Sequence, residues 1–510
     1  MIATVNPLAS AAGLEVLRQG GNAVDAAIAA GAVLTVVEPW SGQLGGDGFL
    51  LIRTGSGESW AINGSGAAPA AATLARYREV GGIPQAGWLA ATVPGLVDAW
   101  AVAAKRFGTR PLASLLEPAI HYAESGFALS ERQAALNAEM AQVSSRFPET
   151  AAIFLPAGRP PGAGDLLKQP DLARTLRAIS RGGPDAFYRG EVAEAMVAAS
   201  SDAGGLFSRT DFSEHRSEVI PPLTVRYRGL DVLEQPPVSQ GIIVLMALAI
   251  LDRFELAKAP SDQTVHLQVE AHKLALARRL EALGDPRFVD VDVRALLSGG
   301  RADEMAGRLD PGRAAPTGVP TQAGADTTYL CVVDSHRNVV SYIHSLYGGN
   351  GVVAGETGVL LNNRMRCFSF DASSPNVLGP GRRPMHTLNS WMLLDGGEPR
   401  YVGGTPGSFW QVQINLQLIS TLLDRGAGPR EAVDWPRWTM GDQTEVNQAW
   451  LRLEGRFGEE TAAGLRRRGH QVELTGDWAA GGAAQLIQIG ADGLTGAGDP
   501  RPGTSTVLGF

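Results

Sequence analysis

The sequence predicts an α/β protein in which helices cover a core of β-sheet. Strand-like segments lie near the start of the chain and again over its last third, and helical periodicity dominates residues 96–283 between them. Hydrophobic residues make up 44% and charged residues 19% of the 510 positions, which is typical of a globular protein. Such a chain is long enough for several small domains or one large multilayer domain, and no internal repeat divides it.

The first 62 residues are expected to form two helices and then a β-hairpin. Gly20-Gly21 separates the two helical patterns, because glycine ends a helix readily. Short Gly-containing turns then bound two strand-like runs, of which the first is strongly apolar. The expected helices are 8–19 and 22–35, and the expected hairpin spans 49–62.

The middle of the chain is expected to be mostly helical, with one strand. The apolar positions recur at helical spacing, and the longest run precedes Leu283. The segment 302–323 is rich in Gly, Pro and Ala and predicts a mobile connector. The expected helices are 95–106, 112–125, 130–142, 169–181, 190–203, 242–253 and 263–283, and the expected strand is 226–234.

The last part of the chain is expected to return to strands and turns. A turn cluster at 334–338 separates two runs of β-type residues. The expected strands are 328–333 and 339–347, and the expected helices lie near 413–423 and 458–468.

Charge and composition argue against several classes of partner. The net charge is −8 and the pI is near 5.6, so neither nucleic acid nor a membrane surface is expected to bind. No run of 18 apolar residues is present, and residues 1–7 lack the basic region of a secretory signal, so we expect a soluble, cytoplasmic protein. Cys331 and Cys367 form neither a disulfide framework nor a metal-ligand spacing, and no metal is expected.

Thr327 lies in the stretch 324–334, at the junction of a loop and a strand. A polar, Gly-containing approach runs straight into the strand 328–333, so Thr327 lies where a loop becomes a strand. A threonine at the head of a strand is ordinarily structural, because β-branched residues suit a pleated surface. The surrounding motifs give it a different interpretation.

Several motifs occur in a fixed order on both sides of Thr327. In this order and spacing the chain resembles the γ-glutamyltranspeptidase family of N-terminal nucleophile hydrolases, over nearly its whole length. The resemblance implies a four-layer αββα sandwich. The motifs are Gly20–Ala27, Gly42–Phe49, Val93–Gly95, Gly284–Pro286, Gly355–Asn363, Pro380–Thr387 and Gly403–Gly407.

In that family the precursor cuts itself before a nucleophilic threonine. By resemblance the scissile bond is Asp326–Thr327, which divides the chain into a large subunit, 1–326, and a small subunit, 327–510, of one composite domain. The chemistry explains why the threonine must become a chain terminus. A hydroxyl is a poor nucleophile at neutral pH, whereas a freed α-amino group, with a reference pKa near 8, can take its proton.

The resemblance also implies roles for other residues. Gly407 and Ser408 match the loop whose backbone N–H groups bind the tetrahedral oxyanion, and Ser345 matches a second hydroxyl that assists the nucleophile. Asn362 and Asn363 match cleft residues, although a structural hydrogen-bonding role is equally open for buried amides. The Gly-rich stretches lack dinucleotide-binding spacing, so no cofactor is expected.

The γ-glutamyl clamp of true transpeptidases is absent. Ser65 occupies the position of the family's arginine, which holds the α-carboxylate. Cys367 occupies the position of the family's acid, which holds the α-amino group. A glutamyl group would leave its charges unpaired here, and the site should reject it. Other substrate-binding positions that differ are Tyr347, Arg364, His386 and Thr387.

Arg364 and Arg366 are cations that the family pattern does not contain. They fall on one face if their segment is extended, where they would either bind a substrate carboxylate or form structural ion pairs.

We therefore expect a self-processing hydrolase or acyltransferase that acts on a non-glutamyl, anionic small-molecule amide. The pattern resembles family members that act on oxamate or glutaryl amides. Three alternatives stay open: cleavage of a C–C or amide bond in a proline-derived antibiotic pathway, a genuine γ-glutamyl enzyme, and a non-maturing binding homologue. The two subunits are expected to stay associated, and a homo-oligomer of this unit is left open.

Overall fold

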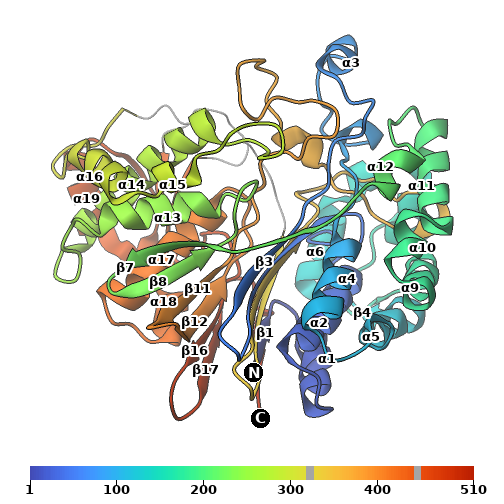
Figure 1. Cartoon of the computed structure of the whole chain (residues 1–510), viewed down its shortest axis with the longest axis horizontal. Helices are drawn as coiled ribbons and strands as arrows, with labels where there is room; N and C mark the ends of the chain where they lie inside the picture. Colours follow the sequence, from blue (N-terminus) through green and yellow to red (C-terminus); the bar gives the residue numbers. More distant parts are fainter. Residues whose placement is uncertain (317–326, 442–449) are drawn as a thin grey trace.

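A computed structural model describes residues 1–316, 327–441 and 450–510. Two antiparallel sheets lie face to face at the centre, and helices cover the outer face of each, as Figure 1 shows. The expected αββα sandwich is confirmed.

The first sheet has seven strands and joins the two ends of the chain. The first and last strands pair with each other, with Ile2 opposite Leu508, so both termini lie at the same end of the molecule (Figure 1). In spatial order the strands are β18 (Thr506–Leu508), β1 (Ile2–Thr4), β9 (Thr328–Val333), β10 (Val339–Ser345), β2 (Asp47–Arg53), β3 (Ser59–Gly64) and β6 (Glu218–Ile220).

The second sheet has six strands, and smaller sheets lie at the periphery. The six strands are β17 (Leu494–Gly498), β16 (Gln485–Ile489), β12 (Glu398–Gly404), β11 (Trp391–Asp395), β8 (Leu230–Glu234) and β7 (Leu223–Tyr227). The peripheral strands are β13 (Trp438–Met440), β14 (Trp450–Glu454) and β15 (Gln471–Thr475) in one sheet, and β4 (Phe127–Ala128) and β5 (Leu166–Leu167) in the other.

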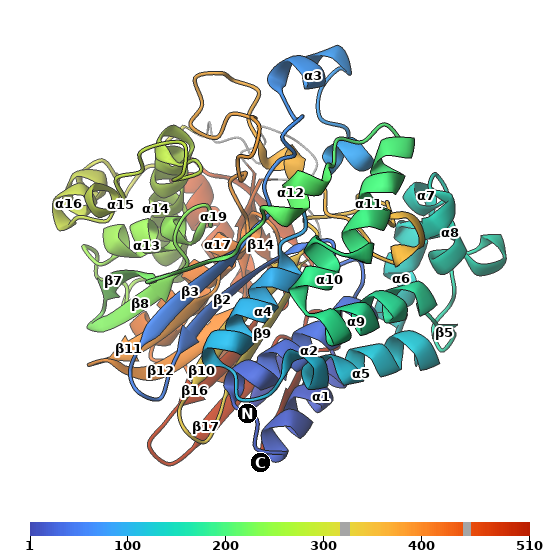
Figure 2. The ribbon, with the colours of Figure 1, turned by 45° about the vertical axis from the view of Figure 1, so that its right-hand side comes forward.

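Helices from the first half of the chain cover the seven-stranded sheet (Figure 2). Every residue of α2 is buried, because this helix lies between the sheet and an outer layer of helices. This accounts for its sequence, which is apolar except for Asp25 and Thr35. The helices of this half are α1 (Pro7–Arg18), α2 (Ala23–Val37), α3 (Leu74–Glu79), α4 (Leu96–Phe107), α5 (Leu112–Ser125), α6 (Glu131–Glu139), α7 (Ala141–Ser144), α8 (Pro148–Phe154), α9 (Pro170–Gly182), α10 (Pro184–Tyr188), α11 (Glu191–Asp202) and α12 (Arg209–Ser213).

Helices from residue 241 onward cover the six-stranded sheet. The helix α13 is buried along its whole length, and it packs with α14 and α17 on this sheet. These helices are α13 (Gly241–Leu251), α14 (Ser261–Ala282), α15 (Val293–Leu296), α16 (Gly299–Gly307), α17 (Trp410–Asp424), α18 (Pro429–Asp434) and α19 (Gly458–Arg467). Short 3₁₀ turns are η1 (Trp88–Ala90), η2 (Pro156–Gly158), η3 (Gly355–Thr357), η4 (Arg364–Cys367) and η5 (Gly455–Phe457).

A third apolar cluster lies between the two sheets. It includes Phe49 and Tyr329 from the first sheet and Met392 and Val402 from the second. Because β9 is covered by helices on one face and by the other sheet on the other, all six of its residues are buried. The head of β9 is therefore fixed inside the molecule.

The structure corrects three expected elements. The segment 226–234 is not one strand but the turn and second strand of a hairpin, in which Arg228 (φ 48°) and Gly229 (φ 87°) form the two-residue turn. The helix expected at 130–142 is divided into α6 and α7, and the strand expected at 339–347 ends at Ser345.

The expected connector 302–323 begins as a helix, since α16 extends to Gly307. Its residues 317–323 lie outside the described residues, as does Asp326. No helix in the described ranges is long and apolar enough to cross a membrane.

Candidate active site

Thr327 lies directly before β9, and its hydroxyl is buried beside a second hydroxyl. The antiparallel register places Thr328 opposite His344, which brings the next residue, Ser345, beside Thr327. Thr327 Oγ1 donates to Ser345 Oγ at 3.0 Å, and the Tyr347 N–H donates to the same oxygen at 2.8 Å. The two hydroxyls that the sequence singled out therefore meet.

The second sheet brings a backbone loop to the same place. Gly407 (φ 130°) and Ser408 (φ 52°) follow β12 and precede α17. For Ser408 this left-handed backbone costs about 1–3 kcal/mol and must be held by its surroundings. Gln240 Nε2 donates to the Ser408 carbonyl at 3.2 Å and to the Thr387 carbonyl at 2.6 Å.

Gln411, on the first turn of α17, connects this loop to Thr327. Its side-chain amide lies 3.4 Å from Thr327 Oγ1. The amide is best satisfied with its oxygen accepting from the Ser408 N–H (3.3 Å) and its nitrogen donating to the Thr387 carbonyl (2.8 Å). The N–H groups of the loop also lie at the N-terminus of a 15-residue helix, where the helix dipole favours negative charge.

Arg364 is fully buried at the centre of the site. Its Nη1 donates to Thr387 Oγ1 at 3.0 Å and lies 3.8 Å from Cys367 Sγ, while its guanidinium lies 4.6 Å from the centre of the Tyr347 ring. Its Nε lies 3.5 Å from Asp47 Oδ2, and its Nη2 has no partner among the described residues.

The segment of Arg364 and Arg366 is a 3₁₀ turn, so it does not meet the condition, an extended backbone, under which the two arginines would share a face. In a turn of about three residues per revolution, residues two apart diverge. Arg364 points into the interior, and Arg366 is half-exposed with no side-chain partner in the described ranges.

Asp47 neutralises the positive charge of Arg364 only in part. Its carboxylate accepts from the Gly66 N–H (2.8 Å) and faces both Arg364 and His386 Nε2 (3.0 Å). Burial, and then repulsion by Arg364, lower the pKa of His386 to about 4 in spite of Asp47, so the ring is neutral at physiological pH. His386 Nδ1 accepts from the Leu388 N–H (3.4 Å), which leaves the proton on Nε2.

The two adjacent asparagines differ. Asn362 donates to the carbonyls of Gly45 and Thr92 and accepts from the Thr92 and Arg364 N–H groups, so its amide is fully engaged. Asn363 is equally buried, but its Oδ1 has no partner among the described residues. Ser65, in contrast, is engaged, since its hydroxyl donates to Asn63 Oδ1 at 2.7 Å.

Tyr347 is the last of the predicted site residues, and its backbone is strained, with φ at 74°. Burial, and then Cys367, raise the pKa of its phenol well above the usual value against the opposing charge of Arg364, so the hydroxyl keeps its proton. Buried polar atoms without partners are rare in folded proteins. Within the described ranges, several of them belong to this site, among them Tyr347 OH, Arg364 Nη2, Asn363 Oδ1 and Ser408 Oγ.

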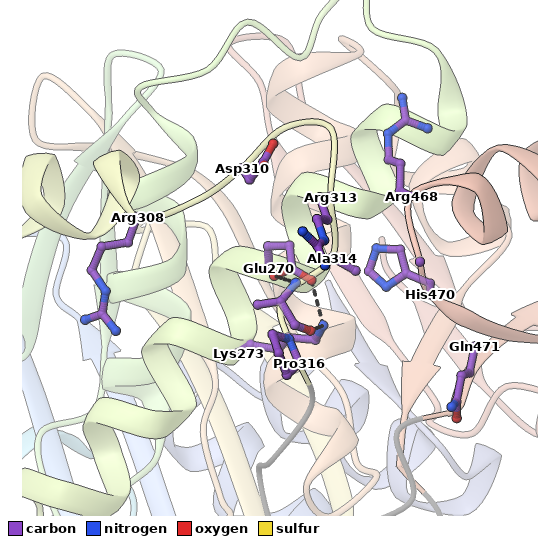
Figure 3. Close-up of a pocket in the computed structure, with 12 residues that line it drawn as sticks. Glu270, Lys273, Arg308, Asp310, Arg313, Ala314, Pro316, Arg468, His470 and Gln471 are labelled. Carbon is purple, nitrogen blue, oxygen red and sulfur yellow. Dashed lines mark hydrogen bonds and ion pairs between the residues drawn. The ribbon is translucent and has the colours of Figure 1, made fainter.

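A pocket of about 790 Å³ beside α14 is separate from this constellation, and none of the predicted site residues lines it (Figure 3). There Glu270 accepts from the Ala315 N–H (3.0 Å) and from Lys273 Nζ (2.6 Å), and Lys273 also donates to the Ala315 carbonyl (3.2 Å).

Beside that ion pair, His266 Nδ1 faces His470 Nε2 at 2.8 Å. With Glu270 these residues offer three ligand atoms within 4.8 Å, but all of these atoms are already bonded to protein groups. We therefore interpret the cluster as an anchor for the segment that leads toward Thr327.

Sequence reasoning missed Asp47, Gln240 and Gln411. Asp47 lies inside a recognised motif, Gly42–Phe49, and its charge amid glycines was the available signal. The two glutamines lie in helical segments that carry no local sign of a site. They belong to the site only because the first turns of α13 and α17 lie beside the Gly407–Ser408 loop in the folded chain.

Comparisons with known proteins identify the family of this chain. The family model described as "Gamma-glutamyltranspeptidase" matches residues 9–508. The chain is 38% identical to the glutathione hydrolase-like YwrD proenzyme of Bacillus subtilis (98% of this chain, 97% of the relative) and 38% identical to the oxamate amidohydrolase proenzyme of Klebsiella pneumoniae (97% and 95%).

Among solved structures, the cephalosporin acylase from Bacillus halodurans matches with a TM-score of 0.94 and 35% identity, covering 100% of this chain and 95% of that one. The relatives are named as hydrolases and proenzymes. The chain is therefore a hydrolase of the γ-glutamyltranspeptidase family.

Proposed function

We propose that the chain is a self-cutting amidohydrolase whose nucleophile is Thr327 and whose substrate carries a negative charge, but no required ammonium group, on its acyl part. The relatives named oxamate amidohydrolase and acylase ACY 1 are consistent with this class. The observation that carries the proposal is Arg364, a fully buried cation whose Nη2 has no partner in the described ranges. Its guanidinium packs on Tyr347, whose N–H bonds to the Ser345 hydroxyl beside Thr327.

Maturation and turnover would use the same hydroxyl. In maturation, Thr327 Oγ1 attacks the Asp326 carbonyl, the acyl group moves from nitrogen to oxygen, and water hydrolyses the ester. This leaves a carboxylate on Asp326 and a free α-amino group on Thr327, and the division into subunits 1–326 and 327–510 follows from it.

In turnover, the α-amino group takes the Thr327 hydroxyl proton as the oxygen attacks the substrate amide. The Gly407 N–H stabilises the oxyanion together with the Ser408 N–H, which exchanges the Gln411 side-chain oxygen for the substrate oxygen, and Ser345 holds the attacking oxygen. The departing amine takes the proton, and water then releases the acyl group from Thr327.

The maturation step is tested by Thr327→Ala, with Thr327→Ser as the matched control. The alanine variant should remain one chain of 53.6 kDa, whereas the wild type and the serine variant should give two chains on a denaturing gel. N-terminal sequencing of the small chain should read Thr-Thr-Tyr in the wild type. Any other start would refute the assignment of Thr327.

The acyl preference is tested with three p-nitroanilides that share a leaving group. Glutaryl carries an anion, pentanoyl is its neutral counterpart, and γ-glutamyl adds an ammonium group to glutaryl. We expect the fastest turnover with glutaryl, slower turnover with pentanoyl and the slowest with γ-glutamyl. Ser65 and Cys367 carry no charge that could pair with the ammonium and carboxylate groups of the γ-glutamyl compound. Strong turnover of the γ-glutamyl compound would favour the alternative of a glutathione hydrolase, the name of the Escherichia coli relative.

A bidentate contact between arginine and carboxylate contributes about 1.5–3 kcal/mol in a partly dry site. Arg364→Gln should therefore lower kcat/KM on the glutaryl compound by about 10- to 150-fold and change pentanoyl turnover little. Asp47→Asn combined with Arg364→Gln removes both charges and controls for an unpaired Asp47. Arg366→Gln, at the half-exposed neighbour, is expected to have a smaller effect.

A further inference from the structure

Arg279, near the end of α14, is a buried cation that pairs with no anion in the described ranges. Only 3% of the residue is exposed, and its side chain forms no ion pair or hydrogen bond with any described residue, its Nε included. The next residue along the chain offers a contrast, because Arg278 is partly exposed and pairs with Glu281 at 2.5 Å. An unpaired charge in the interior is strongly unfavourable and calls for a partner.

The surroundings of Arg279 belong to the site of Thr327. Its guanidinium carbon lies 5.8 Å from the centre of the Phe409 ring, and Phe409 directly follows Ser408. Its charge also acts on Tyr347 and Cys367, the two residues that contact Arg364. Burial lowers the pKa of Arg279 to about 10, so it stays charged at neutral pH.

The charges of the site do not balance. Arg364 and Arg279 supply two positive charges, Asp47 supplies one negative charge, and His386 is neutral. Among these buried side chains the enzyme therefore carries one surplus positive charge close to Tyr347, and Arg366, whose charge also acts on Tyr347, adds to the excess. A substrate carboxylate would neutralise it.

A purely structural role explains Arg279 less well. The distance to the Phe409 ring is near the outer limit of a cation–π contact. An apolar side chain of similar length would fill the same space between α14 and α17 without a buried charge.

We propose that Arg279 is a second anion-binding group of the acyl subsite, so that the substrate's carboxylate is held by Arg279 together with Arg364. This inference rests on the proposed anionic-acyl function and adds the residue that determines its charge selectivity. The ligand class is a carboxylate on the acyl chain of an amide.

The test compares Arg279→Met with Arg279→Lys and with Arg278→Met as the matched control, using glutaryl- and pentanoyl-p-nitroanilide. We expect Arg279→Met to lower kcat/KM on the glutaryl compound at least 10-fold and to change pentanoyl turnover less than 3-fold. Arg279→Lys should recover part of the loss, and Arg278→Met should behave as the wild type.

The melting temperature is a second measurement that separates the two roles. If Arg279 were structural, its replacement would lower the melting temperature. Without ligand, Arg279→Met should melt at or above the wild-type temperature, because it removes an unpaired buried charge. Glutarate should raise the melting temperature of the wild type and of Arg278→Met but not of Arg279→Met. Sodium sulfate at the same ionic strength controls for a non-specific anion effect.

The outcomes separate the two proposals. If the wild type and Arg279→Met prefer the glutaryl compound equally, Arg279 has no role in binding, and the proposed function stands. If the wild type shows neither the preference nor stabilisation by glutarate, the proposed function itself fails. A lower melting temperature of Arg279→Met, with unchanged selectivity in Arg279→Lys, would make Arg279 structural and overturn the inference.

Discussion

Asn362 and Asn363 are chemically identical neighbours with different surroundings. The first bonds to two backbone carbonyls and two backbone N–H groups, which joins the segments around Gly45, Thr92 and Arg364. The second precedes Arg364, and its Oδ1 has no partner in the part of the chain that the structure describes. The first amide therefore stabilises the fold, and the second is available to a substrate.

This difference predicts opposite effects of the same substitution. Asn362→Ala leaves several buried backbone groups without partners and should lower the free energy of unfolding by about 3 kcal/mol. Asn363→Ala should change stability by less than about 1 kcal/mol but lower kcat/KM on glutaryl-p-nitroanilide about 10-fold. Melting temperatures and steady-state kinetics of both variants check this. Equal destabilisation of the two would mean that Asn363 is structural as well.

Single residues also mark the limit of sequence reasoning. Thr327 and Ser345 were identifiable because each occupies a fixed place in a motif, and the structure joins their hydroxyls. Arg279 and Gln411 were not, because a buried arginine or glutamine in a helix has no local pattern that separates it from a surface residue. Their contacts depend on how α14 and α17 pack beside the loop of Ser408.

At the scale of elements, long segments with strong periodicity were predicted correctly, whereas short segments were not. The helix expected at 112–125 is α5, and the strand expected at 328–333 is β9, since both have unbroken patterns between clear end signals. The hairpin of β7 and β8 appeared as one strand because its two-residue turn, Arg228-Gly229, interrupts the pattern too briefly. The 3₁₀ turn at Arg364 has no sequence period at all.

At the scale of the whole molecule, the site depends on strands from both sides of the Asp326–Thr327 bond. The seven-stranded sheet places β9 and β10, which follow that bond, between β1 and β2, which precede it. The layer order could be expected only from the family resemblance, because strand order is a long-range property that local patterns do not determine. This interleaving explains why two chains produced by cutting would stay associated.

The buried histidines predict how the whole fold responds to acid. Burial is the first cause that lowers the pKa of His215 and His386 to about 4 and of His272 and His344 to about 3. The unfolded chain takes up these protons near pH 6.5, so their contribution to stability is complete above that pH and is lost as the pH falls toward 4. Each histidine contributes a slope of up to about 1.4 kcal/mol per pH unit in this window.

We therefore expect the melting temperature to be nearly constant above pH 7 and to fall steeply between pH 6.5 and 4. The uncut Thr327→Ala chain is the suitable sample, since its unfolding involves one chain. In that background, His272→Leu should reduce the slope, because His272 Nδ1 has no partner among the described residues and its ring only packs near Trp438. Replacement of the exposed His121 by Gln serves as the control. Equal melting temperatures at pH 5 and pH 7 would show that the buried imidazoles gain protons without unfolding.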